Sequence, residues 1–187
     1  CSSDDDSPSI IDAVVTAPDT YIFERAGEST VSYAGQTARL EMAASLFNKL
    51  NDENVDESAL LQMFNDGTGF YADANITDAD QIAAVLALNN AGKKLGNKTA
   101  AYGDSSVQPK IAGFLTEYAQ DVSTNFNQQA AAGVAGTYST ASRVVRVNGK
   151  GMELNQVFAK SLIGALVMDQ VAYGYLSEVK IGDSVDN

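Results

Sequence analysis

The longest apolar segment of the chain runs from about Glu153 to Leu176. Its middle, LIGALVM over residues 162–168, is apolar on most sides, so the pattern predicts the central and most buried helix of the domain. Gly164 lowers the helix propensity there by about 1 kcal/mol relative to Ala. We therefore expect a neighbouring helix, the one over 109–130, to pack closely on Gly164, so that Gly164→Leu overpacks the site and destabilises the fold.

Three further segments carry apolar residues at three- and four-residue steps, which is the spacing of an amphipathic helix. They cover residues 36–51, residues 56 or 57 to 64, and residues 109 to about 130. Another helix is expected to begin at a capping box, Thr77-Asp-Ala-Asp80. Short extended pieces are expected at 21–25, 30–33 and 144–147. The predicted fold class is all-α: a helical bundle of about four main helices with short irregular or extended connections.

The charge and composition exclude several functions. The 187 residues include 12 basic and 24 acidic ones, giving a net charge of −12 and arguing against nucleic-acid binding, which depends on Lys and Arg. Histidine is absent and Cys1 is the only cysteine, so these residues hold neither a Ser-His-Asp triad nor an imidazole- or thiolate-ligated metal. We therefore expect a protein without enzymatic activity and without a cofactor.

The amino terminus predicts a lipid anchor. Cys1 is followed by SSDDDSPS, with no apolar residue before Ile10. Such a segment cannot bury enough surface to offset its ordering entropy, so residues 1–19 are expected to be a flexible tether. A helical domain over 20–180 and a tail over 181–187 are expected to follow. A cysteine at the start of an acidic tether is typical of a bacterial lipoprotein after signal-peptide cleavage, and it predicts an outer-membrane protein facing the cell exterior.

Two sets of residues are candidate sites. Asp66, Asp73, Asp78 and Asp80 lie in or near a glycine-rich segment, and carboxylates on a bending loop could bind calcium. Their spacing does not match an EF-hand, and a helix start also explains Asp78 and Asp80, so we assign no metal site. Asp169 interrupts the apolar final helix, and it could pair with Arg39 of the first helix across the core.

Four sequence stretches carry a resemblance to a known family. They are residues 20–40 (TYIFERAGESTVSYAGQTARL), 94–99 (KLGNKT), 151–156 (GMELNQ) and 160–165 (KSLIGA). The chain resembles the amino-terminal half of the DUF4856 lipoproteins, a group placed near the imelysin-like proteins. The resemblance implies an all-α fold of paired four-helix bundles on the cell surface and a role near iron acquisition.

The chain departs from that resemblance in two ways. No histidine matches the Gly-x-His-x-x-Glu motif of imelysin-like proteins. The resembling chains are also about twice as long, with a histidine-rich helix in their second half. No catalytic or metal-binding residue can therefore be carried over to this chain.

Two functions fit these observations. The first is a non-enzymatic outer-membrane lipoprotein that acts as a binding or accessory subunit of an outer-membrane protein complex. Lipid on Cys1 would hold it to the membrane, and it would bind a protein partner there. The alternative is an imelysin-like metal- or iron-acquisition protein whose metal site lies in a second half outside this chain. A peptidase is the least favoured function, because histidine is absent.

Acylation of Cys1 is the first testable prediction. The native protein should carry lipid on the cysteine, because each buried methylene of an acyl chain contributes about 0.8 kcal/mol to anchoring. Mass spectrometry of the amino-terminal peptide from native membranes measures the added mass. An unmodified amino-terminal cysteine would refute the anchor.

Overall fold

The computed structural model describes residues 20, 22–74, 76–99 and 106–177. The expected tether over 1–19, with Cys1, and the expected tail over 181–187 lie outside these residues. Contacts divide the chain into two units, Cys1–Ser32 and Tyr33–Asn187, and each is described by itself.

The described part of the first unit is a small antiparallel hairpin. Strand β1 (Glu24–Arg25) pairs with β2 (Glu28–Ser29), with Glu24 opposite Ser29. Ala26 and Gly27 form the turn with positive φ angles of 54° and 83°, as the tight turn of a two-residue hairpin requires. The second strand thus begins two residues before the segment expected at 30–33.

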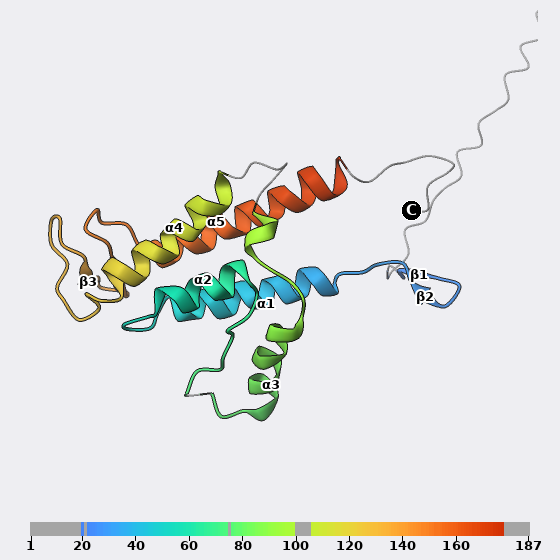
Figure 1. Ribbon diagram of the computed structural model, residues 1–187, viewed down its shortest axis with the longest axis horizontal. Helices are drawn as coiled ribbons and strands as arrows, with labels where there is room; N and C mark the ends of the chain where they lie inside the picture. The colour runs from blue at the N-terminus through green and yellow to red at the C-terminus, as the bar shows by residue number, and fades with distance from the viewer. Residues whose placement is uncertain (1–19, 21, 75, 100–105, 178–187) are drawn as a thin grey trace, which may run out of the picture. The chain divides into compact units, whose positions relative to one another are not determined.

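In the second unit, five α-helices lie within the described residues (Figure 1). Helices α4 and α5 each continue into a π-helical segment, and α3 continues into a 3₁₀ turn. The bounds are α1 (Ala34–Lys49), α2 (Glu57–Asn65), α3 (Ala79–Ala87) with η1 (Leu88–Asn90), η2 (Gly96–Lys98), α4 (Val107–Glu117) with η4 (Tyr118–Val122), and α5 (Leu154–Met168) with η5 (Asp169–Tyr175).

Aspartate side chains start two of these helices. The Asp56 carboxylate accepts the backbone N–H of Ser58 at the start of α2. At α3 the cap is Asp78, which accepts the N–H groups of Asp80 and Gln81 at 3.0 and 2.9 Å. The sequence placed this cap one residue earlier, at Thr77, and that placement is wrong. A carboxylate beside the first turn satisfies free backbone donors and complements the positive end of the helix dipole.

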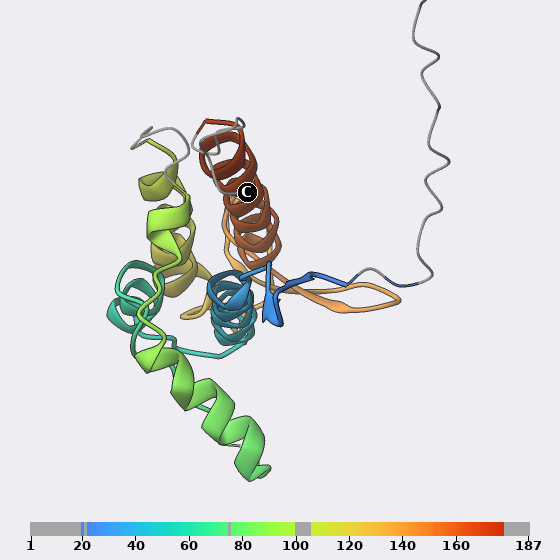
Figure 2. The same cartoon turned by 90° about the vertical axis from the view of Figure 1, so that its right-hand side faces the viewer.

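Four helices surround the core of the second unit. Helix α1 packs against α2 and α5, α2 packs along α4, and α4 packs along α5 (Figure 2). Fully buried side chains converge from all four, including Leu46 of α1, Leu60 of α2, Leu115 of α4 and Leu162 of α5. Phe64 and Phe158 meet edge to face near the middle, with ring centroids 6.3 Å apart.

A second hairpin makes the fold mixed α/β, so the predicted all-α bundle is wrong. Strand β3 (Gly136–Ser139) pairs antiparallel with β4 (Val144–Val147), and 52% of the described residues are helical. The strand expected at 144–147 is present, but its partner was not foreseen. The β-branched residues of 144–147 suit a strand, and Gly133 and Gly136 end any helical pattern before it. After β4, the side-chain oxygen of Asn148 accepts hydrogen bonds from the backbone N–H groups of Lys150 and Met152, which orders the turn that leads into α5.

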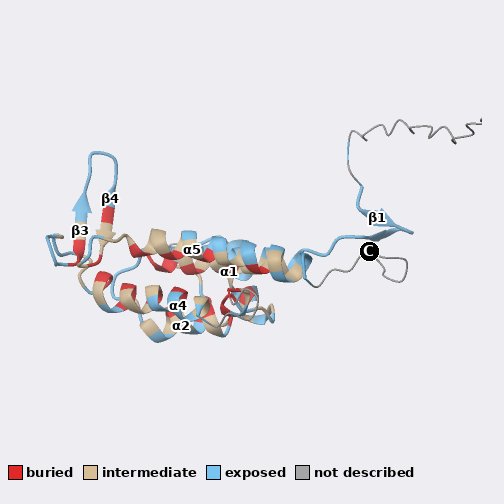
Figure 3. Ribbon diagram, turned by 90° about the horizontal axis from the view of Figure 1, so that it is seen from above, coloured by how far each residue is buried: buried red, intermediate tan, exposed pale blue. Residues whose placement is uncertain are grey.

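Helix α5 is not the central buried helix that its apolar sequence predicts. Its buried apolar residues are Leu154, Phe158 and Leu162, whereas Ile163, Val167 and Met168 are 58, 55 and 57% exposed (Figure 3). A Cβ atom added to Gly164 would meet no described atom within 4 Å, so the expected close packing of the 109–130 helix there is also wrong. The physical reason is that α1 and α4 cover only one side of α5 among the described residues.

Helix α3 stands apart from the other helices. None of its residues is buried, although its sequence ADQIAAVLA has a single charge. It projects away from the four packed helices in Figure 2, and it reaches the core through Val85 and through η1, which contacts α1.

The open surroundings of Gly164 reverse the expected effect of filling that position. Gly164→Ala should raise the free energy of unfolding by up to about 1 kcal/mol, because the new methyl group meets no atom and the helix propensity improves. Urea unfolding measures the change. Gly67→Ala is the matched control: φ is +68° and the new Cβ would lie 1.8 Å from the Lys93 carbonyl oxygen, so this variant should lose stability. A destabilised Gly164→Ala would contradict the open helix face.

Candidate functional site

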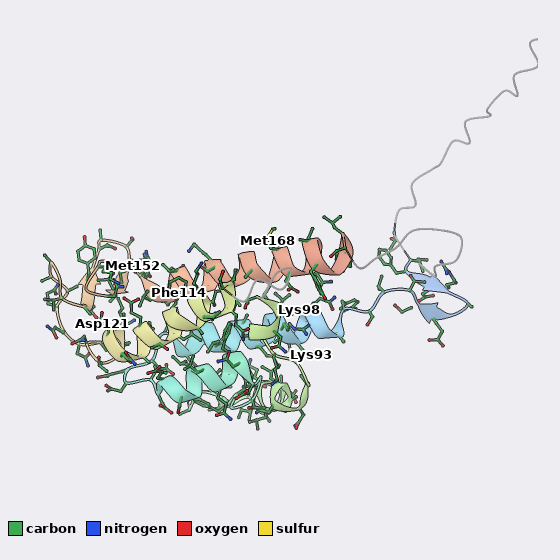
Figure 4. All side chains as sticks on the ribbon, turned by 45° about the horizontal axis from the view of Figure 1, so that its top comes forward. Lys93, Lys98, Phe114, Asp121, Met152 and Met168 are labelled. Atoms are coloured by element: carbon green, nitrogen blue, oxygen red, sulfur yellow. The ribbon has the colours of Figure 1, made fainter. Side chains whose placement is uncertain are left out.

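The solvent-facing side of α5 and η5 is an apolar stripe. Ile163, Val167, Val171 and Tyr175 follow one another at four-residue steps and are all exposed. Gly164 and Met168 lie beside them in the sequence and are also exposed, and Figure 4 labels Met168. Asp169 is the one charged residue between positions 161 and 176, and it is buried. An apolar helix surface without exposed charge, on a protein of net charge −12, is typical of a contact surface for another macromolecule.

A groove between α1 and α5 widens this stripe. One cavity of about 310 Å³ is lined by Leu40, Ala43, Ala44 and Phe47 of α1 and by Phe158, Ala159, Leu162 and Ile163 of α5. A second cavity of about 190 Å³ lies next to it, because Leu40 lines both. Leu40 is 62% exposed, although it is one of the apolar residues whose spacing predicts the helix over 36–51. We call the stripe and this groove together the α1–α5 face.

The charged residues that line the second cavity are basic. Arg39 and Lys98 lie there with Val167 and Gln170, and Figure 4 labels Lys98. Burial lowers the pKa of Arg39, and the carboxylate of Asp169 opposes that effect. The groove therefore has an apolar floor and a basic end.

The predicted pair of Arg39 and Asp169 lies at this basic end, but the direct partner of Asp169 is Lys98. The Lys98 Nζ atom lies 3.0 Å from the buried carboxylate. Arg39 interacts with Asp169 through its charge and donates hydrogen bonds to the carbonyl oxygens of Gly35 and Lys94, at 3.2 and 3.3 Å. Sequence reasoning missed Lys98, because η2 is a single turn without a periodic pattern.

The structure does not gather the four candidate calcium ligands. Asp73 pairs with Lys49, Asp66 lies 3.9 Å from Lys94, and Asp78 caps α3. Asp80 is exposed in the first turn of that helix. Within the described residues no group of three or more acidic, cysteine or histidine side chains is placed to hold a metal ion.

Lys49 is a buried cation at the end of α1. Its side chain is 2% exposed, it contacts Asp73 directly, and its Nζ atom lies 3.7 Å from the centre of the Tyr71 ring. Asp52 lies 3.8 Å away and is half exposed. Asp73 and Tyr71 belong to the loop between α2 and α3, so this contact ties the loop to α1. The same loop forms one wall of a cavity of about 330 Å³ between α1 and α3.

The structure is that of a helix-rich α/β protein with an exposed apolar stripe on α5 and a groove beside it that has a basic end. The comparison with protein families then places it: the chain belongs to the DUF4856 family, a domain of unknown function, which it matches over residues 18–187. This confirms the resemblance to DUF4856, while the link to imelysin-like proteins stays a prediction. No curated protein and no solved structure matches the chain. None of the helices in the described part of the chain has the length and apolarity to cross a membrane.

The contact between Lys49 and Asp73 yields a stability prediction. Asp73→Ala should lower the free energy of unfolding by about 3 kcal/mol, because it leaves a buried cation with only the more distant Asp52. Lys49→Met should change stability by less than about 1 kcal/mol, since an apolar side chain of similar length fills the site and Asp73 can be solvated. Urea denaturation compares the two variants. Equal losses in both would show that Lys49 is not a buried charge.

Proposed function

We propose that this protein is a non-enzymatic, lipid-anchored subunit of the outer membrane that docks a partner protein on the α1–α5 face. The observation that carries the proposal is the exposed apolar stripe of α5, which has no exposed charge on a strongly acidic protein. Burying such a surface contributes about 25 cal/mol per Å² to association, whereas leaving it in water gives no benefit. Localisation and anchoring rest on Cys1 and the acidic segment after it.

The chemistry of the groove indicates the partner. The apolar floor between Leu40 and Ile163 accepts apolar side chains of a helix laid along it. Arg39 and Lys98 line one end of the groove and share a single carboxylate, Asp169, so one positive charge is left over there and favours a carboxylate on that helix. The occupant is therefore an amphipathic helix with an apolar face and an acidic end. A second copy of this chain is disfavoured, because each copy carries −12.

Site-specific photo-crosslinking in native membranes tests this proposal. A photoreactive phenylalanine analogue at Val167 should give one adduct with a partner protein, mapped by mass spectrometry to an amphipathic helix with acidic residues. The same analogue at Lys110, an exposed residue of α4, should give no such adduct. Val167→Glu, combined with the analogue at Met168, should abolish the adduct, since an interface residue at the centre of a contact can contribute about 2 kcal/mol or more.

The stability of Val167→Glu provides the control. The side chain is more than half exposed, so the free energy of unfolding should change by less than about 0.5 kcal/mol. An adduct of twice the mass of the chain would mean self-association, and a lipid adduct would mean a membrane-facing surface; either result contradicts a protein partner. A crosslink to a further part of the same polypeptide would favour the imelysin-like alternative.

A further inference from the structure

A polar cavity lies where the loop after η4 meets the β3–β4 hairpin. Its volume is about 270 Å³, and it is lined by Phe126, Asn127, Gln128, Gln129, Thr137 and Arg146. The hairpin leads into the first residues of α5, whereas the apolar stripe occupies the other end of that helix (Figure 1). The cavity is therefore separate from the α1–α5 face and does not depend on the function proposed for it.

Arg146 is the charged residue among the lining side chains, and no carboxylate of the described residues pairs with it. Its guanidinium carbon lies 3.6 Å from the centre of the Phe126 ring, so one face of the cation is stacked on an aromatic. Its Nε atom is enclosed and has no hydrogen-bond acceptor, and no carboxylate of the described residues lies within ion-pair distance. Arg143, three residues earlier, does have a carboxylate partner, because its terminal nitrogens donate two hydrogen bonds to Glu153 at 2.7 and 2.8 Å.

The surroundings of Arg146 leave its charge uncompensated. The other polar lining groups are neutral amides and the hydroxyl of Thr137, which already donates to the Phe126 carbonyl oxygen. The buried Tyr118 hydroxyl also has no hydrogen-bond partner among the described residues; burial raises its pKa to about 12, and the nearby Arg146 opposes that rise. The hydroxyl is therefore neutral at physiological pH and supplies no negative charge.

The rim of the cavity offers further donors. Gln128 and Gln129 are exposed, and none of their side-chain atoms is engaged in a hydrogen bond to a described residue. The Asn127 amide donates to Glu53 at 2.8 Å, which fixes that side chain at the mouth. Amide N–H groups around a stacked guanidinium are suited to an anion with two coplanar oxygens.

We propose that this cavity binds a small ligand through a carboxylate, which the terminal nitrogens of Arg146 hold and the amides of Gln128 and Gln129 contact from the rim. The planar fork of the guanidinium matches a carboxylate, and Phe126 fixes its plane. A singly charged ligand is favoured over a phosphate of higher charge, because the protein carries −12.

Titration of the isotopically labelled protein with lactate tests this assignment by nuclear magnetic resonance. Lactate should shift the Arg146 Nε–H signal and the side-chain amide signals of Gln128 and Gln129, at concentrations up to about 10 mM, where a Kd of about 1 mM is measurable. Lactamide, a neutral analogue of the same shape, should bind at least about tenfold more weakly, because a charge-assisted contact is lost. Inorganic phosphate is the comparison anion.

Two variants separate this site from a general charge effect. Arg146→Gln should weaken lactate binding at least about tenfold, whereas Arg143→Gln, which removes the same charge from the same hairpin, should leave it unchanged. Arg146→Lys keeps the charge without the fork and should lose part of the affinity, which keeps the test valid if the glutamine variant does not fold. The proposal is overturned by equal binding of lactate and lactamide, by binding of phosphate alone, by an unchanged affinity in Arg146→Gln, or by no binding of lactate at about 10 mM.

Discussion

The edge-to-face contact of Phe64 and Phe158 joins α2 and α5, two helices on opposite sides of the core. Phe64 comes from α2 and Phe158 from α5, the rings meet at an interplanar angle of 73°, and both side chains are fully buried. A pair in this geometry contributes about 0.5–1.5 kcal/mol beyond the burial of its area. Because α1 and α4 each pack against both of these helices, the ring contact lies in the middle of the four-helix core and fills it. The hairpin and α3 are attached around this arrangement.

The positions of the helices could be predicted from the sequence, but their buried sides could not. On α1 the apolar residues Met42 and Leu46 are fully buried, whereas Leu40 is exposed and lines the groove, although all three belong to the same apolar pattern. A helix that is apolar on two sides gives the same periodicity whichever side is covered. The same ambiguity made α5 look like a central helix. What decides between the two sides is the number of neighbouring helices, and that is a property of the tertiary structure.

The charged sites depended even more on contacts between distant residues. Asp73 was a candidate metal ligand because of its local composition, yet its partner is Lys49, 24 residues earlier in the chain. In the sequence, Lys49 looks like an ordinary surface lysine near the end of a helix. Only the structure shows that its side chain is buried. Arg146 was read as part of a short strand. The sequence does not show that the Phe126 ring stacks on the Arg146 guanidinium, because the two residues come from different segments that meet only in the folded protein.

The π-helical winding of η5 has a geometric consequence for the surface of α5. In an α-helix of 3.6 residues per turn, a row of side chains at every fourth residue drifts steadily around the axis. The wider turns of Asp169–Tyr175, closed by i→i+5 hydrogen bonds, hold more residues and turn the row back. The side chains from Ile163 to Tyr175 therefore keep nearly one direction along the helix. A straight helix could therefore contact this row along its whole length. Two helices whose contact rows drift around their axes must instead supercoil to stay in contact.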